Sequence, residues 1–226
     1  MKNTNAGVQE KHIKAVQEGL GVFDKVFNQS NVEYRVLGSV LVAALNGKPH
    51  RTLGDIDVLV DQTEYEKMIS NLQTEGYTIE TKHKSGFSWT EAHHDGNLGF
   101  TFLLIGRFLK DYFSCKLSKN IELRISTRYL EPTKYFLLGI SFVGLPLRSI
   151  YEGLKISSLN PKRTLDRKVV IDYLKGNIPS GETLDRSFKV YLSGVEIPYA
   201  YTLFSQLYNI YGGLRVLLGR KYEIWN

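Results

Sequence analysis

Two aspartates that stand two positions apart, Asp55 and Asp57, are the residues of this sequence best suited to chemistry. They lie in the run GDIDVLV, among apolar residues that are typical of a β-strand rather than of a surface loop. Side chains two apart on a strand project from the same face, so both carboxylates would lie together. Adjacent carboxylates raise each other's pKa unless a cation neutralises them. A divalent metal such as Mg²⁺, bound with a triphosphate, is the usual cation at such an oxygen site.

A second pair of residues, Gly38-Ser39, ends a short apolar run and is followed at once by the apolar residues 40–45. At the start of a helix, this pair would offer bare backbone N–H groups and a hydroxyl, which is where phosphate binds. The loop that follows carries Lys48 and Arg51. Either would add positive charge near a phosphate, although a solvated loop position explains them equally well.

This arrangement of Gly-Ser, a basic loop and apolar-Asp-apolar-Asp-apolar resembles the active-site core of the DNA polymerase β-like nucleotidyltransferase superfamily. The resemblance is to its small stand-alone members, the antibiotic nucleotidyltransferases and the abortive-infection or minimal-nucleotidyltransferase toxin and antitoxin proteins. It is specific over residues 34–77 and traceable to about residue 174. It implies that Asp55 and Asp57 hold Mg²⁺ (or Mn²⁺) on the phosphates of an NTP, with Gly38-Ser39 on the outer phosphates. An acceptor hydroxyl would then attack the α-phosphorus in line, and pyrophosphate would leave.

The family also uses a third carboxylate on a neighbouring strand, and here the sequence departs from the family pattern. Thr101, in the run GFTFLLIG, stands where that acid would be. The nearest substitute is Glu122 in NIELRIS, although a solvent-facing glutamate that alternates with Arg124 explains this position as well. Three other acids are expected in loops or at turns and are weaker candidates: Glu91, Asp95 and Asp111.

Lys155 matches a helix lysine that reaches the triphosphate in relatives of the family. The basic and acidic residues that follow it are more readily given structural roles: Arg163, Lys168 and Asp172. The adjacent pair His93-His94 lacks the spacing of a metal site, because neighbours on a strand face opposite ways. We therefore expect this pair in an exposed loop.

The composition limits the cellular compartments and the classes of binding partner that we expect. The single cysteine, Cys115, excludes an intramolecular disulfide and a cysteine-rich zinc site. No apolar run approaches the ~18 residues of a membrane span, and the N-terminus is polar, so we expect a cytoplasmic protein without a membrane partner. The net charge of +6 favours an approaching nucleotide or nucleic acid. The acceptor stays open among a small molecule, a protein and tRNA, as does assembly into a homodimer.

The surrounding pattern predicts an α/β (α+β) fold in which helices pack mainly on one side of a mixed, twisted sheet. Residues 83–97 are expected to form a loop or ragged hairpin, and residues 135–143 a single strand. After Gly176 the pattern indicates helices alone, broken at Pro198 and Gly212-Gly213. The predicted domains are therefore a nucleotidyltransferase-like core, residues 1–176, and a C-terminal helical cap, residues 177–226.

The leading hypothesis is a metal-dependent nucleotidyltransferase that moves a nucleoside monophosphate from an NTP to an unidentified hydroxyl or nucleic-acid acceptor. The alternative is a catalytically weakened protein of the same fold, which binds nucleotide or acts as a toxin or antitoxin. Thr101 favours this alternative, because loss of the third acid would weaken both metal binding and the general base.

Overall fold

A computed structural model describes residues 3–84, 87–109, 111–116, 118–155 and 160–219. Its centre is an 11-stranded sheet in the order β11-β10-β7-β6-β5-β2-β1-β9-β8, with β4 also pairing β5 and β3 pairing β4. The strands are β1 (Tyr34–Val36), β2 (Asp55–Asp61), β3 (Thr78–Lys84), β4 (Phe87–His93), β5 (Gly99–Leu109), β6 (Tyr112–Lys116), β7 (Ile121–Ser126), β8 (Thr133–Leu137), β9 (Ile140–Gly144), β10 (Phe188–Leu192) and β11 (Val195–Ile197).

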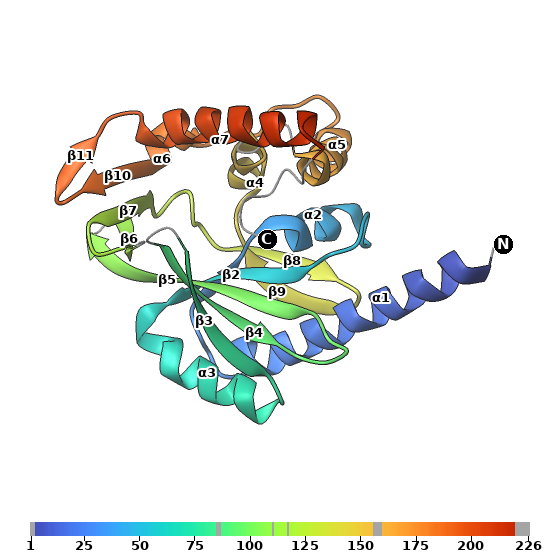
Figure 1. Ribbon diagram of the computed structural model, residues 1–226. Coiled ribbons are helices and arrows are strands. Elements are labelled where there is room, and N and C mark those ends of the chain that lie inside the picture. The colour runs from blue at the N-terminus through green and yellow to red at the C-terminus, as the bar shows by residue number, and fades with distance from the viewer. Residues whose placement is uncertain (1–2, 85–86, 110, 117, 156–159, 220–226) are drawn as a thin grey trace.

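The sheet has mixed strand directions, as the sequence predicts. Strand β2 runs parallel to β5 and antiparallel to β1, and β1 in turn runs parallel to β9. The helices are α1 (Asn3–Phe23), which continues as a π-helical turn (Asp24–Asn28), α2 (Gly38–Asn46), α3 (Tyr65–Thr74), α4 (Leu147–Gly153), α5 (Pro161–Leu174), α6 (Leu184–Ser187) and α7 (Ala200–Leu217). Figure 1 shows α1 and α3 below the sheet, and α2, α4, α5 and α7 above it.

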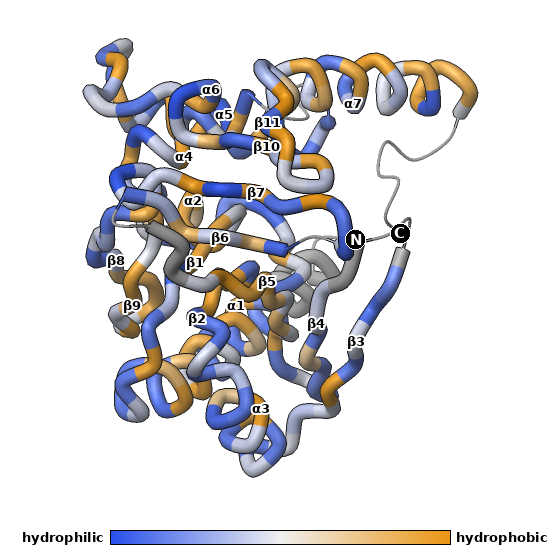
Figure 2. Tube along the Cα trace, turned by 90° about the vertical axis from the view of Figure 1, so that its left-hand side faces the viewer, coloured by the Kyte–Doolittle hydropathy of each residue, from blue (hydrophilic) through white to orange (hydrophobic). Residues whose placement is uncertain are grey.

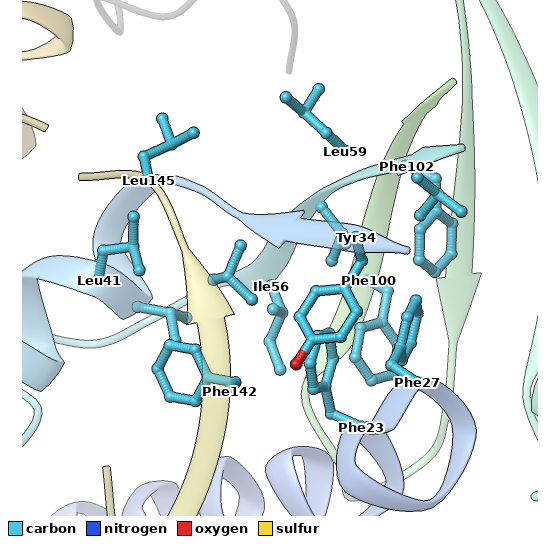
Figure 3. Close-up of a cluster of buried hydrophobic side chains, with 14 of the residues drawn as sticks. Phe23, Phe27, Tyr34, Leu41, Ile56, Leu59, Phe100, Phe102, Phe142 and Leu145 are labelled. Atoms are coloured by element: carbon cyan, nitrogen blue, oxygen red, sulfur yellow. The ribbon is translucent and has the colours of Figure 1, made fainter. Parts of the chain in front are cut away.

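The alternation of residues along β2 explains why its two faces differ. Ile56, Val58 and Val60 are buried on the lower face. They face an aromatic cluster in which Phe23 and Phe27 stack with ring centroids 4.3 Å apart, next to the phenylalanines of β5 (Figure 3). Burial of large apolar side chains stabilises this face by about 1.5–3 kcal/mol each. The opposite register leaves Asp55, Asp57 and Leu59 on the upper face.

Residues 135–143 form a hairpin rather than the predicted single strand. Leu138 and Gly139 adopt positive φ angles of 51° and 85°, the conformation of a tight two-residue turn between β8 and β9. Leucine rarely adopts this conformation, so the sequence carries no ordinary turn signal. Residues 87–93, within the segment expected as a loop or ragged hairpin, form the regular strand β4, which pairs with β3.

The C-terminal segment is not wholly helical, so that prediction is wrong over residues 188–197. Strand β10 pairs antiparallel with β7, and a turn at Ser193-Gly194, both with positive φ, leads into β11. The apolar residues of this segment fit either spacing, and pairing with an available sheet edge decides the outcome. Pro198 does separate β11 from α7, but Gly212-Gly213 lies inside α7. The domain boundary at residue 176 stays a prediction.

Helix α7 keeps many large apolar side chains exposed. In Figure 2 much of its tube is orange, the colour of hydrophobic residues. In the part of the chain that the structure describes, however, no helix combines the length and apolar character that a membrane crossing requires.

Candidate active site

Asp55 and Asp57 lie together on the upper face of β2, as predicted. The neighbouring strand places Thr101 beside Asp57 in register, and the Thr101 hydroxyl donates a hydrogen bond to Asp55 Oδ2 at 2.5 Å. Burial and the adjacent Asp55 together raise the pKa of Asp57 to about 7, although Arg163 and Arg51 lower it in part. A nearby cation favours the ionised form of a carboxyl group whose pKa is raised in this way, so this position suits a cation.

The start of α2 is built against this carboxylate. Gly38 has a φ of 67°, and a Cβ at this position would overlap Asp57 Oδ2, so both the backbone angle and the close approach require glycine. The N–H of Leu37 also donates to the carbonyl oxygen of Asp57 at 2.8 Å. No side chain caps this helix N-terminus. Its first N–H groups, beside Ser39, therefore suit an anion such as phosphate.

The loop before β2 is tied to α5 by a buried ionic cluster. Arg51 donates to both carboxylate oxygens of Asp166, at 2.7 and 3.0 Å, and His50 Nε2 lies 2.7 Å from one of them. Asp166 is fully buried; burial raises its pKa, but the hydrogen bonds from His50 and Arg51 outweigh this and lower it to about 2. The guanidinium of Arg51 is thus engaged with Asp166, whereas the sequence suggests a phosphate contact.

Arg163 stands on the same helix three residues before Asp166, so both residues share one face of α5. It borders the same cavity as Asp57 and Gly38, and its charge lowers the pKa of Asp57. The sequence assigns Arg163 a structural role. The signal available in the sequence was the three-residue spacing of Arg163 and Asp166 on a predicted helix, which places both side chains on one face of that helix.

Comparisons with known proteins agree with this geometry. A sequence model of the aminoglycoside-2''-adenylyltransferase family matches residues 20–103. Among solved structures, the chain is similar to the lincosamide antibiotic adenylyltransferase LnuA in its lincomycin-bound form, with a TM-score of 0.57 and 18% identity over 70% of this chain and 98% of that one. It is also similar to the solution structure of the antibiotic-resistance factor ANT(2'')-Ia, with a TM-score of 0.50 and 10% identity over 69% of this chain and 83% of that one.

The family model covers less than half of the chain, and the structural similarities show that the chain shares the fold of these nucleotidyltransferases. The family resemblance and the fold class predicted from the sequence are both confirmed. None of the curated protein sequences matches the chain. The matched range holds the glycine-serine pair and both aspartates, so the remaining question in this nucleotidyltransferase fold is which further side chains reach the acid pair.

Glu122 does not reach it, and this prediction needs correction. Strand β7 is the third strand from β2, and strand spacings of about 4.8 Å separate the two by about 14 Å. Leu123 and Ile125 border the cavity beside Asp57, so Glu122 projects from the opposite face of β7. Its carboxylate instead accepts a hydrogen bond from Arg124 Nε at 3.0 Å. The solvent-face explanation was the better one.

Lys155 is likewise directed elsewhere. Its Nζ lies 2.7 Å from Glu152 Oε1, and the same oxygen also pairs with Arg148 at 2.7 Å. Glu152 is only 2% exposed, so these cations neutralise a buried carboxylate. Lys155 borders a separate hollow with Arg167, not the cavity beside Asp57.

Glu91, expected in a loop, lies on β4 directly opposite Thr101. Cross-strand partners share a face, so Glu91, Thr101 and Asp57 follow one line across three strands. Glu91 also borders one hollow with Asp55. Its carboxylate accepts from Trp89 Nε1 at 2.7 Å and lies 3.1 Å from His93 Nε2. In the sequence, the small residues Thr90 and Ala92 alternate with the larger Trp89, Glu91 and His93. This alternation was the available signal for a strand.

The donor set fits a hard divalent cation only in part. Two carboxylates with an adjacent hydroxyl are oxygen ligands of the kind that Mg²⁺ and Mn²⁺ prefer. Within the described ranges, no group of three His, Cys, Asp or Glu side chains is arranged to hold a metal, and this includes the His93-His94 region. Mg²⁺ characteristically completes its shell with phosphate oxygens and water, which suits a site that also holds a triphosphate.

Proposed function

We propose that this chain is a metal-dependent nucleotidyltransferase that transfers AMP from ATP to a hydroxyl group of an acceptor. The observation that carries the proposal is the half-buried Asp57, which lies beside Asp55 and packs against the uncapped N-terminus of α2. ATP is the proposed donor because the matching family and LnuA are named as adenylyltransferases. The two aspartates would hold Mg²⁺, which when bound supplies the positive charge that offsets the triphosphate.

The chain's own residues divide the remaining work. The N–H groups of Gly38 and Ser39 would bind the outer phosphates, and Arg163 would add a fixed positive charge beside them. The Thr101 hydroxyl orients Asp55 through its hydrogen bond. Phosphoryl transfer depends chiefly on positioning and charge stabilisation, so these contacts account for most of what the site must provide.

Glu91 is the proposed general base. The acceptor oxygen forms a bond to the α-phosphorus, the bond between that phosphorus and the bridging oxygen breaks, and pyrophosphate leaves with the bridging oxygen. The proton of the acceptor hydroxyl passes to the Glu91 carboxylate. His93, whose side chain is 54% exposed and pairs with Glu91, would then pass the proton to solvent.

Calorimetry with ATP and Mg²⁺, combined with transfer of label from ATP labelled at its α-phosphate, tests the proposal. We expect binding by the natural chain and a loss of about tenfold or more in affinity in Asp57→Asn. Glu122→Gln is the matched control, because it removes a strand carboxylate that lies outside the site. Equal ATP binding by Asp57→Asn and the natural chain, or no binding by either, would show that the proposal is wrong.

A second candidate function is nucleotide binding without turnover, favoured by Thr101 at the position of the family's third acid. If it is right, the chain binds Mg²⁺-ATP but moves no label to any acceptor, and Glu91→Gln changes nothing. Thr101→Asp should then tighten Mg²⁺ binding, because it adds an acid beside Asp57.

A further inference from the structure

An apolar chamber lies next to Asp57 on the upper face of the sheet. It has a volume of about 320 Å³. Its floor is formed by the sheet residues Leu59, Leu103, Leu123 and Ile125, and helices α2 and α4 line it from above. We define these surroundings as the apolar chamber. The size is at the lower end for small-molecule sites, which suits a ring or a short alkyl chain.

The polar groups around the chamber are largely engaged with one another. The Tyr129 hydroxyl donates to the carbonyl oxygen of Ser149 at 3.0 Å, and the Ser149 hydroxyl donates back to the carbonyl oxygen of Tyr129 at 2.7 Å. The Thr101 hydroxyl is bound to Asp55. A polar ligand would lose its hydrogen bonds to water here and gain few in return, whereas an apolar ligand loses nothing.

Charge also limits what the chamber can take. Of the described residues that border it, only Asp57 and Arg163 have acidic or basic side chains. Polycations require several carboxylates, and the one acid here is the proposed metal ligand. A nucleobase would also bring hydrogen-bonding edges that these walls do not satisfy. The far wall adds an aromatic surface, in which Phe188 and Tyr201 stack with ring centroids 4.5 Å apart.

We propose that the apolar chamber binds the body of the acceptor, and that the acceptor is a neutral, largely apolar hydroxyl compound rather than a polycationic aminoglycoside. This assignment rests on the proposed nucleotidyl transfer, because it places the acceptor hydroxyl at the chamber end that Asp57 and Thr101 border. Strand β10 and helix α7 contribute the aromatic wall, so the C-terminal segment takes part in selecting the acceptor.

The first test is the binding of a neutral fluorescent dye, N-phenyl-1-naphthylamine, to the full chain. We expect Leu103→Trp, which fills the chamber from its floor, to weaken dye binding by about tenfold or more. Leu217→Trp is the matched control, because Leu217 is 84% exposed on α7 and a dye bound there would respond to it instead. Leu123→Trp fills the chamber from another strand and serves if the first variant does not fold, as judged by circular dichroism.

The second test compares acceptors, using ATP labelled at the α-phosphate with 2-(1-naphthyl)ethanol or kanamycin. We expect about tenfold or more label on the naphthyl alcohol, and a loss of this preference in Leu103→Trp. Preferential labelling of kanamycin, or dye affinity that Leu103→Trp leaves unchanged, would overturn the assignment. ATP binding, measured separately, distinguishes the two failures: ATP binding without dye binding refutes the chamber alone, while dye binding without ATP binding refutes the transferase and the acceptor assignment together.

Discussion

Two hollows of opposite character meet at the acid pair on β2. The hollow on the Asp55 side has a volume of about 550 Å³ and is bordered by Glu91, His93 and Lys162. The apolar chamber on the Asp57 side is bordered mainly by leucine, isoleucine and aromatic side chains. Thr101 borders both. The difference fits the proposed roles of the two hollows, with proton transfer on the polar side and recognition of the acceptor body on the apolar side.

We expect the largest loss of activity from a substitution at the boundary between the two hollows. Asp57→Asn keeps the shape of the side chain but removes its charge, so metal and phosphate would no longer be held. Because charge stabilisation of phosphoryl transfer is worth about 10³-fold or more, we expect label transfer from ATP to fall by at least that factor. Glu122→Gln should leave transfer unchanged, and a transfer rate in Asp57→Asn within a few-fold of the natural chain would argue against a shared boundary.

The polar side is tested by Glu91→Gln. General-base catalysis contributes about 10²–10⁴-fold, so we expect the turnover rate to fall by about 10² while ATP affinity stays close to that of the natural chain. Asp95→Asn, in the neighbouring turn, is the control. If Glu91→Gln keeps full turnover, proton transfer does not belong to this hollow.

The Asp166 cluster holds the loop before β2 against α5, the helix that carries Arg163. Asp166→Asn leaves Arg51 and His50 without a buried negative partner, which costs about 3–5 kcal/mol of unfolding free energy. Because the pKa of Asp166 is lowered to about 2 from 3.8, the stability it contributes is present above pH 3.8 and is lost as pH falls through 2. Denaturation by urea measures the change, with Asp172→Asn on the exposed face of the same helix as control. Equal stability of both variants would refute the supporting role.

The last prediction concerns the pH dependence of stability that comes from Asp57. Its pKa is raised from 3.8 to about 7, so the folded chain holds a proton between these values that the unfolded chain has released. The free energy of unfolding should therefore fall as pH rises from about 4 to 7, by about 1.4 kcal/mol per unit at most. Melting temperatures without metal should fall between these pH values in the natural chain but not in Asp57→Asn, and added Mg²⁺ should reverse the fall at pH above 7. A flat profile would contradict the raised pKa of Asp57.

Local spacing was sufficient to predict one half of the site. The strand period joins Asp55 to Asp57, and glycine at the helix start joins α2 to them, because both depend on residues that are close in the sequence. Glu91 required the pairing of β4 with β5, a non-local contact that no short pattern contains. The basic residue that lies beside the acids is Arg163 rather than the predicted Lys155. The packing of α5 against α2 decides this, and helix propensity does not.

The C-terminal segment shows the same limit in the fold. Residues 188–197 carry no pattern that excludes a helix, and they form strands because β7 offers an edge on which to pair. Predicting that edge would have required knowing the order β5-β6-β7 beforehand. The aromatic wall of the apolar chamber, Phe188 and Tyr201, depends on this pairing and could not be placed from the sequence.

The most direct test of the central claim, that Asp55 and Asp57 hold a divalent cation on the phosphates of ATP, is Mn²⁺ binding measured by electron paramagnetic resonance with a non-reactive α,β-methylene analogue of ATP. We predict that the analogue strengthens Mn²⁺ binding in the natural chain and in Glu122→Gln. Asp57→Asn and Asp55→Asn should each weaken this binding by about tenfold or more. Mn²⁺ binding of natural strength in the Asp55→Asn, Asp57→Asn double variant would contradict the account.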